Sequence, residues 1–386
     1  MDMNFTTEEI LTRGVNQVLP DKKGLSDLMS KRKIKLYQGF DPSAPSLHLG
    51  NFVGLMKLRQ FQKLGHKVIF LVGDFSGMIG DPTDKLAART KLTREQVLKN
   101  AKAWKKQASM LLDFGGENPA QIVFNSKWLD KLNFKDIIEL SSNITVQQLI
   151  ERDMFQERIK SKAPIYLHEF LYPIVTGYDS IALEVDLEIG GNDQLFNIMV
   201  GRSLEKAVIN KEKYALTTKL LVDKEGKKVG KTTGNALFLD SKPRDFYAGI
   251  MSFPDEVILL GYELLTEISL EGLEKKIAAS PMLEKKNLAF EIVKLLWGEV
   301  LAKKAARTFE NNFQKREAEY TLGIKKLKSL AETIAPYTSL KSTGDAKRLI
   351  QQGGLTINGD VVTDLSYKIK KGDRVKIGKK VFGTLI

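Results

Sequence analysis

Two short segments of the chain, His48–Asn51 and Lys228–Thr232, carry residue types suited to chemistry on phosphate. The first follows a strand-like run (33–37) and opens a helix-like run (52–64). A glycine at such a turn lets a nucleotide approach the backbone, and the amide groups at a helix N-terminus attract phosphate. The second segment places two lysines around a glycine, and mobile cations stabilise the charge on a departing polyphosphate. Together the two segments favour a site for ATP.

Each segment taken alone also has a structural explanation. A histidine just before a glycine at a helix start is commonly a cap or turn residue, and a lysine-rich loop is commonly an exposed surface without a role. The functional interpretation depends on finding both segments in this order and in these contexts.

The elements that must position these segments are those of a parallel sheet with crossover helices, because strand signals alternate with helix signals in the N-terminal half. Thr93 begins one helix with a capping box, since Gln96 follows three residues later. Ligands in such sheets bind beyond the carboxyl ends of the strands. We expect strands at 33–37, 67–72, 121–124 and 185–189, and helices at 52–64, from 93 to about 112, and after Gly191 to about 207.

The composition excludes several classes of protein. The chain has 386 residues, of which 42% are hydrophobic and 28% charged, which is typical of a globular protein of two or three domains. We find neither a membrane span nor a signal peptide, and expect a cytoplasmic protein. The chain has no Cys, and its three histidines are far apart, so we expect no zinc site. Of these histidines, His66 is expected at the surface and His168 in a structural role.

The C-terminal part changes character twice. From Pro243 to about Phe313 apolar residues recur at helical spacing, and Asn311–Tyr320 is polar enough to predict a linker. Beyond it, a helix signal (345–352) precedes short β runs around an Asn-Gly turn. The last 66 residues hold 13 Lys and Arg against 5 Asp and Glu, within a chain of net charge +13. Such a basic module suits RNA, although a basic surface also aids solubility.

Five segments, taken in order, resemble the bacterial-type tyrosyl-tRNA synthetases, which are class I aminoacyl-tRNA synthetases. They are Leu36–Asn51, Ile79–Thr83 with Lys85 and Arg89, Tyr172–Asp179, Gly190–Gln194 and Lys228–Thr232. The stretch from Asp345 to Gly354, with the turn after it, resembles an αL-type RNA-binding domain of the kind named after a ribosomal protein. The resemblance covers nearly the whole chain.

The resemblance implies an α/β fold in three parts. These are a Rossmann-like parallel-sheet catalytic domain (1–222), an α-helical domain that begins with the second signature loop (223–312), and a small α+β RNA-binding domain (323–386) after a linker (313–322). The implied activity is tyrosine–tRNA ligation. Tyrosine and ATP form tyrosyl-adenylate and pyrophosphate, and the tyrosyl group then passes to the 3′ end of tRNA(Tyr).

For tyrosine, the resemblance implies a pocket that recognises both ends of the amino acid. A phenol needs one acceptor and one donor, which Asp179 and Tyr37 would supply, and phenylalanine would leave both unpaired. Thr176 stands where the family usually has Gln, so the contact to the amino group is weaker or passes through water. The residues assigned to tyrosine are Tyr37, Asp81, Tyr172, Thr176, Asp179 and Gln194.

For ATP, the resemblance implies positioning and charge stabilisation without a general base, because the tyrosine carboxylate is already anionic. Mg²⁺ would accompany ATP. Asn51 replaces the second histidine of the stricter first signature, and Val229 and Gly230 replace Met and Ser of the second. The residues assigned to ATP are Gly39, Asp41, His48, Gly50, Asn51, Gly191, Asp193 and Lys231. Those assigned to catalysis are Ser43, His48, Asn51, Lys85, Arg89, Lys228, Lys231 and Thr232.

The partners implied are tyrosine, ATP, tRNA(Tyr) and a second copy of the chain, with Lys347 and Arg348 as the best candidates for RNA contacts. Two rivals stay open. One is a tryptophanyl or other class I ligase, against which the pair Tyr37 and Asp179 argues. The other is an RNA-binding protein derived from a synthetase but without activity, against which the retained signature residues argue.

Overall fold

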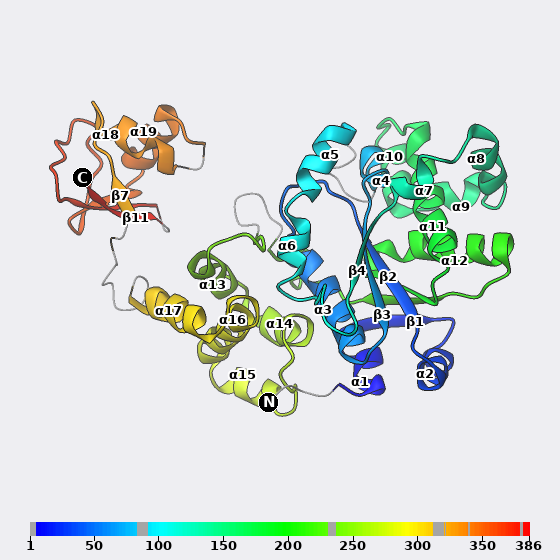
Figure 1. Cartoon of the computed structure of the whole chain (residues 1–386). Helices are drawn as coiled ribbons and strands as arrows, with labels where there is room; N and C mark the ends of the chain where they lie inside the picture. Colours follow the sequence, from blue (N-terminus) through cyan, green and yellow to red (C-terminus); the bar gives the residue numbers. More distant parts are fainter. Residues whose placement is uncertain are drawn as a thin grey trace. The chain divides into compact units, whose positions relative to one another are not determined.

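The structure, a computed structural model, describes residues 5–82, 92–230, 237–311, 320, 322–338, 340–378 and 381–386. The chain divides into two compact units, Met1–Ala302 and Lys303–Ile386 (Figure 1). Within the described residues, no helix is both long enough and apolar enough to cross a membrane.

A six-stranded sheet lies at the centre of the first unit, in the order β1-β6-β5-β2-β3-β4. The pairs among β2 to β6 are parallel, and β1 joins the edge antiparallel to β6. This topology confirms the predicted parallel α/β fold, in which the carboxyl ends of neighbouring strands meet at one edge. The strands are β1 (Val15–Leu19), β2 (Lys35–Phe40), β3 (Lys67–Val72), β4 (Gln121–Phe124), β5 (Leu187–Gly191) and β6 (Tyr214–Thr218).

The strands that the sequence predicts best are those with uninterrupted apolar runs. The bounds of β3 and β4 are those predicted, whereas β2 and β5 each begin two residues later than predicted. The sequence pattern does not predict β1 or β6. Most side chains of β1 are only partly buried, which leaves no clear apolar pattern, and two of the five residues of β6 are threonines.

Helices cover both faces of this sheet, with α3 on one side and α11 and α12 on the other (Figure 1). α11 and α12 approach closely, since a Cβ on Gly177 would lie 3.1 Å from Cα of Gly201. The helices of this part are α1 (Thr7–Thr12), α2 (Lys22–Lys31), α3 (Leu49–Lys63), α4 (Ser76–Ile79), α5 (Arg94–Ala101), α6 (Trp104–Ala108), α7 (Ser126–Leu129), α8 (Phe134–Ser141), α9 (Val146–Ile150), α10 (Asp153–Lys160), α11 (Tyr172–Leu183) and α12 (Leu195–Ile209).

The predicted helix from Thr93 to about Leu112 is divided in two, α5 and α6. Its predicted start is confirmed, because Thr93 and Gln96 form a reciprocal capping box. Lys102 and Ala103 separate the two helices, and the buried Trp104, the first residue of α6, packs edge-on against Phe70 of β3. Packing of this buried indole therefore overrides the local helical pattern.

The surface location expected for His66 is wrong. Its side chain is buried, and its Nδ1 accepts a hydrogen bond from the amide of Ile34 (3.2 Å). Burial lowers the pKa of His66 to about 4, so the ring is neutral and acts as an acceptor for the start of β2. His168, by contrast, is exposed and lies beside the ring of Tyr166.

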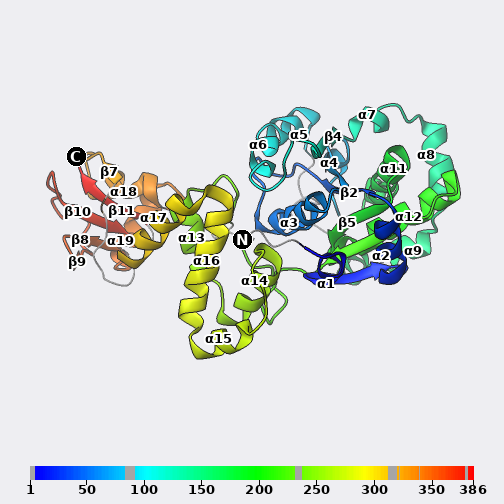
Figure 2. The same ribbon diagram turned by 60° about the horizontal axis from the view of Figure 1, so that its bottom comes forward.

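The predicted helical region is present and packs around one long helix, α16 (Pro281–Trp297), which Figure 2 shows with α15 at its start. Its buried apolar side chains include Leu288, Ile292 and Val293. The helices that pack against it are α13 (Pro243–Met251), α14 (Ile258–Leu265) and α15 (Leu273–Ala279), whereas α17 (Glu299–Phe309) crosses the boundary between the two units.

The second unit contains a small five-stranded sheet in the order β7-β11-β10-β8-β9. Its core includes Ala346 and Ile350 of α19 packed with strand residues such as Leu355 and Val375. β8 and β10 are among the short β runs predicted there, and α19 begins two residues earlier than predicted, at an N-cap formed by Ser342. The elements are β7 (Leu322–Ile324), α18 (Leu330–Ile334), α19 (Thr343–Gln351), β8 (Leu355–Ile357), β9 (Asp360–Val361), β10 (Arg374–Ile377) and β11 (Val381–Leu385).

Candidate active site

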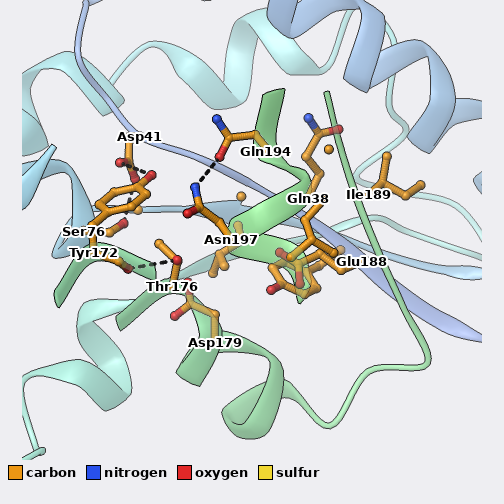
Figure 3. Close-up of a pocket in the computed structure, with 16 residues that line it drawn as sticks. Gln38, Asp41, Ser76, Tyr172, Thr176, Asp179, Glu188, Ile189, Gln194 and Asn197 are labelled. Atoms are coloured by element: carbon orange, nitrogen blue, oxygen red, sulfur yellow. Dashed lines mark hydrogen bonds between the residues drawn. The ribbon is translucent and has the colours of Figure 1, made fainter. Parts of the chain in front are cut away.

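A pocket opens where β2, β3 and β5 end, against one face of α11 (Figure 3). It encloses about 520 Å³ of empty space, a figure that includes the open mouth. The predicted site residues that line it are Tyr37, Gly39, Asp41, Tyr172, Thr176, Asp179 and Gln194. The sheet and α11 therefore bring together residues that lie more than a hundred positions apart in the sequence.

Tyr37 and Asp179 are both buried in this pocket, one on β2 and the other on α11. The hydroxyl of Tyr37 lies 3.0 Å from Oγ of Ser180. Burial raises the pKa of Tyr37 well above its usual range, so the side chain stays a neutral phenol that can both donate and accept.

Asp179 is held by two donors that the sequence reasoning missed. Trp128 Nε1 donates to Oδ1 (2.8 Å) and Asn125 Nδ2 donates to Oδ2 (3.2 Å). Burial raises the pKa of Asp179 well above its usual range, and these two hydrogen bonds oppose that rise. Asn125 and Trp128 follow the predicted strand 121–124 directly, so the rule that ligands bind at carboxyl ends was a signal that could have found them.

Asp41 is the centre of a second polar cluster. Its Oδ1 accepts from Ser76 Oγ (2.6 Å) and its Oδ2 accepts from the hydroxyl of Tyr172 (2.9 Å). Burial raises the pKa of Asp41 to about 7, against the effect of both hydrogen bonds. Thr176 lines the pocket, but its hydroxyl donates to the carbonyl of Tyr172 within its own helix (3.0 Å).

A third cluster joins Asp81 to the turn after β5. Gln194 Nε2 donates to Asp81 Oδ2 (2.6 Å), and Asn197 Nδ2 donates to Gln194 Oε1 (2.8 Å). Oδ1 of Asn197 is buried without a hydrogen-bond partner among the described residues. Asp81 does not line the pocket itself but orients Gln194, which does.

The first signature forms the start of α3. Nδ1 of His48 accepts from the amide of Asn51 (3.2 Å), and Asn51 Oδ1 accepts from the amide of His48 (2.9 Å). A role of His48 as a helix cap is therefore compatible with a role of this segment in phosphate binding. The imidazole and the carboxamide hold in place the helix terminus at which a phosphate would bind. A Cβ on Gly50 would lie 2.9 Å from Cε1 of His48, so the ring occupies the space that glycine leaves open.

The second signature lies directly against the first. The amide of Leu49 donates to the carbonyl of Leu237 (2.9 Å), and the amide of Leu237 donates to that of Gly230 (3.0 Å). Gly230 has φ +74°, and a Cβ there would lie 2.8 Å from Leu49 Cδ2. Backbone pairing thus brings together two segments that the sequence only suggests are related.

Lys228 links this loop to the turn after β5. Its Nζ donates to Asp193 Oδ2 (2.6 Å), and both side chains are partly exposed. Gly191 ends β5 immediately before this turn, and a Cβ there would lie 2.5 Å from Asp193 Oδ1. Ser43 is exposed in the loop after β2, with its amide donating to the carbonyl of Asp41.

Four of the predicted catalytic residues, Lys85, Arg89, Lys231 and Thr232, lie outside the described residues, as does most of the predicted linker 313–322. In the second unit, Lys347 and Arg348 are exposed on α19, and Arg348 lies 3.7 Å from Asp345. The described part of the chain contains no group of three or more His, Cys, Asp and Glu residues that could hold a metal ion.

Comparison with known proteins places this site in a family. Residues 29–314 match the family described as tRNA synthetases class I (W and Y), and residues 339–375 match the S4 domain. The chain is 41% identical to the tyrosine–tRNA ligase of Aquifex aeolicus strain VF5, over 98% of each chain. It is 40% identical to that of Haemophilus influenzae, over 99% of this chain and 96% of the relative. The chain therefore belongs to the tyrosine–tRNA ligase family of class I synthetases.

Solved structures show the same fold. A C-terminally truncated mitochondrial tyrosyl-tRNA synthetase of Aspergillus nidulans superposes with a TM-score of 0.68 at 22% identity, covering 80% of this chain and 94% of that one. A tyrosyl-tRNA synthetase of Archaeoglobus fulgidus, complexed with L-tyrosine, gives 0.60 at 21% identity, covering 78% and 98%. The predicted family and fold are thus confirmed, and the S4 match agrees with the predicted RNA-binding domain.

Proposed function

We propose that this chain activates tyrosine with ATP and transfers it to tRNA(Tyr). A carboxylate oxygen of tyrosine attacks the α-phosphorus, the bond to pyrophosphate breaks, and tyrosyl-adenylate forms. A hydroxyl of the terminal ribose of tRNA then attacks the activated carbonyl, and AMP leaves. The observation that carries the proposal is the pocket that contains Tyr37 and Asp179. The two signature segments pair with each other near the same edge of the sheet.

In this proposal the tyrosine side chain enters between Tyr37 and Asp179. The Asp179 carboxylate, already oriented by Trp128 and Asn125, accepts the phenol proton, and Tyr37 donates to the phenol oxygen. A phenylalanine ring would leave both buried groups without a partner, which costs about 1–3 kcal/mol for each neutral group and more for a charged one.

The amino group and the ATP phosphates then belong at the pocket mouth. Asp81 and Tyr172 supply oxygens for an ammonium group, and Gln194 lies near the substrate carboxyl group. The N-terminus of α3 and the cations of the second signature stabilise charge on the phosphates, and Lys228 leaves Asp193 to do so. Mg²⁺ arrives on the ATP phosphates and is part of the same proposal.

A homodimer is also proposed. Large apolar side chains are exposed over α8 to α10 and the segment that follows, a composition typical of a protein–protein interface. They are Phe134, Ile138, Val146, Ile159, Tyr166 and Leu167, of which Phe134 and Leu167 are about four-fifths exposed. Sedimentation should give twice the mass of the chain, and Phe134→Glu should shift it toward the monomer.

The second unit is proposed to bind tRNA through Lys347, Arg348 and the other basic residues of the tail. The finer division into a catalytic domain, a helical domain and a linker is proposed with it, at the boundaries given above. The relatives at about 40% identity, those of Aquifex aeolicus and Haemophilus influenzae, are bacterial, and bacterial ribosomes use aminoacyl-tRNA in the cytoplasm, so we propose that location for this chain.

The test is ATP–pyrophosphate exchange with tyrosine, tryptophan and phenylalanine in turn, followed by aminoacylation of tRNA(Tyr). Tyrosine should support exchange far better than the other two, and charging should require the tRNA. Exchange that depends on tryptophan instead would contradict the substrate, and tRNA binding without any exchange would leave only an RNA-binding protein.

A further inference from the structure

A buried charged cluster lies next to the pocket and has no role in the mechanism described so far. Lys213, which precedes β6, is fully buried, and its Nζ donates to Ser180 Oγ (2.5 Å) and to the carboxylate of Glu188. Glu188 lies on β5 and lines the same pocket as Asp179 (Figure 3). Removing two charges from water is costly even when they are paired with each other, so the presence of this buried pair needs a physical explanation.

The cluster touches the tyrosine pocket through one hydroxyl. Ser180 is fully buried, and its Oγ lies 3.0 Å from the hydroxyl of Tyr37. Lys213 Nζ lies 6.0 Å from the centre of the Tyr37 ring. A continuous chain of polar contacts therefore runs from Lys213 through Ser180 to the group that would meet the phenol of the substrate.

The hydrogen-bonding groups in this series of contacts fix which atom donates and which accepts at each step. Lysine has only donors, so Ser180 Oγ accepts from Lys213. Ser180 has one proton of its own, and the carboxylate that competes for it, Glu188, is 3.3 Å away and already accepts from Lys213. When Ser180 donates to Tyr37, the Tyr37 oxygen is an acceptor on that side. The Tyr37 proton then has two possible acceptors, the carboxylate of Glu188 and a phenol bound in the pocket. Because Glu188 already accepts from Lys213, it competes less strongly for that proton.

The packing of the neighbouring helix leaves space for this ammonium group. A Cβ on Gly201 of α12 would lie 2.8 Å from Lys213 Nζ, 3.1 Å from Ser180 Oγ and 3.3 Å from a carboxylate oxygen of Glu188. A side chain larger than glycine at this position would displace the cluster. The glycine thus leaves room for a buried charged cluster at a place where α11 and α12 would otherwise pack through apolar side chains.

We propose that Lys213 is a positioning residue for substrate discrimination, which acts through Ser180 to keep the Tyr37 hydroxyl oriented as a donor toward the phenol of bound tyrosine. Lys213 also balances Glu188, so that Asp179 is the carboxylate left to accept the phenol proton. The inference rests on the proposed function and adds the residue that orients one of its two specificity groups.

The first test replaces Lys213 by methionine, which has a similar length but no charge, and measures pyrophosphate exchange with tyrosine and with phenylalanine. KM for tyrosine should rise about 10- to 100-fold, the range for loss of a hydrogen bond in a charged network. kcat/KM for phenylalanine, which has no hydroxyl to orient, should change by less than about threefold. Lys285→Met is the matched control, since Lys285 is also buried and paired, with Asp255 in the helical region, and should leave the ratio of the two substrates unchanged.

Two further variants keep the inference falsifiable if Lys213→Met folds poorly. Ser180→Ala removes the hydrogen bond between Lys213 and Ser180 but leaves Lys213 paired with Glu188. It should lower the ratio of kcat/KM for tyrosine to kcat/KM for phenylalanine in the same way. In a Tyr37→Phe background, adding Ser180→Ala or Lys213→Met should change the tyrosine KM by less than about threefold, because the group they act through is gone.

Two results would overturn the inference. One is an equal loss for tyrosine and phenylalanine in Ser180→Ala and Lys213→Met, and the other is an undiminished loss in the Tyr37→Phe background. Failure of the proposed function is a separate outcome, because it would appear as an absence of tyrosine-dependent exchange in the unmodified chain.

Discussion

The substitution Asp179→Asn tests the pocket most directly, because the structure surrounds this carboxylate with donors. Trp128 Nε1 and Asn125 Nδ2 each donate to one of its oxygens. An asparagine has one acceptor oxygen and one NH₂ group. Whichever way the amide is turned, its NH₂ group must face one of these donors, and the phenol of tyrosine loses a charged acceptor.

Two separate costs follow from this geometry. Loss of the charge-assisted hydrogen bond to the phenol should cost about 1.5–3 kcal/mol of tyrosine binding, or roughly 10- to 150-fold. The clash of donors should lower the free energy of unfolding by about 1–3 kcal/mol, because one buried donor is left unpaired. The second cost affects every substrate, whereas the first affects only tyrosine.

Pyrophosphate exchange with tyrosine and with phenylalanine separates the two costs. The ratio of kcat/KM values cancels the damage common to both substrates, so it should fall by at least about tenfold. Thermal unfolding of the variant gives the structural cost independently. If the ratio is unchanged while both rates fall together, Asp179 is a structural residue and the assignment of the pocket is wrong.

Three other changes test different parts of the molecule. Lys231→Ala should slow the formation of tyrosyl-adenylate far more than it weakens tyrosine binding, because a mobile cation acts on the transition state; equal losses in a pre-steady-state assay would contradict this. A chain that ends at Tyr320 should still catalyse tyrosine-dependent exchange but charge tRNA poorly and with a weaker dependence on salt, since the tail carries 13 Lys and Arg against 5 Asp and Glu; charging equal to that of the full chain at matched salt would show that the tail is not a tRNA-binding module. Glu205→Gln should stabilise the fold increasingly between about pH 4.5 and pH 7, by about 2–3 kcal/mol at the upper end. The side chain of Glu205 is fully buried, its carboxylate has no hydrogen-bond partner among the described residues, and burial raises its pKa from 4.5 to about 7. The folded protein therefore holds a proton that the unfolded chain releases, and the stability of the unmodified protein falls as the pH rises through this range. Chemical denaturation at several pH values measures the difference, and a difference that does not depend on pH would refute the assignment.

Much of the fold was predictable because its local signals are strong. The apolar runs of β3 and β4, the capping box at Thr93 and the basic C-terminal segment each depend on neighbours within a few residues. The signature residues were recognisable for the same reason, since their types and spacing are visible in a linear chain. His66 and the break before Trp104 were not predictable, because burial against residues distant in sequence decides both.

The same distinction between local and long-range information applies to the candidate active site. The sequence indicates which residues belong to the pocket, including Tyr37, Asp179 and Gln194, but not what holds each of them. The donors on Asp179, the pairing of Leu49 with Leu237 and the contact of Lys213 with Ser180 join positions far apart in the chain.

The sequence by itself therefore determined the family and the strands β2 to β5 with the helical crossovers between them, and it predicted which groups would meet tyrosine and ATP. Only the tertiary structure decided the direction of the hydrogen bonds around those groups and the charges beside them. The physical reason is that residue types and short-range periodicity are local properties. The pKa of a buried carboxyl or the orientation of a buried hydroxyl depends instead on which distant side chains the sheet and helices bring within about 3 Å.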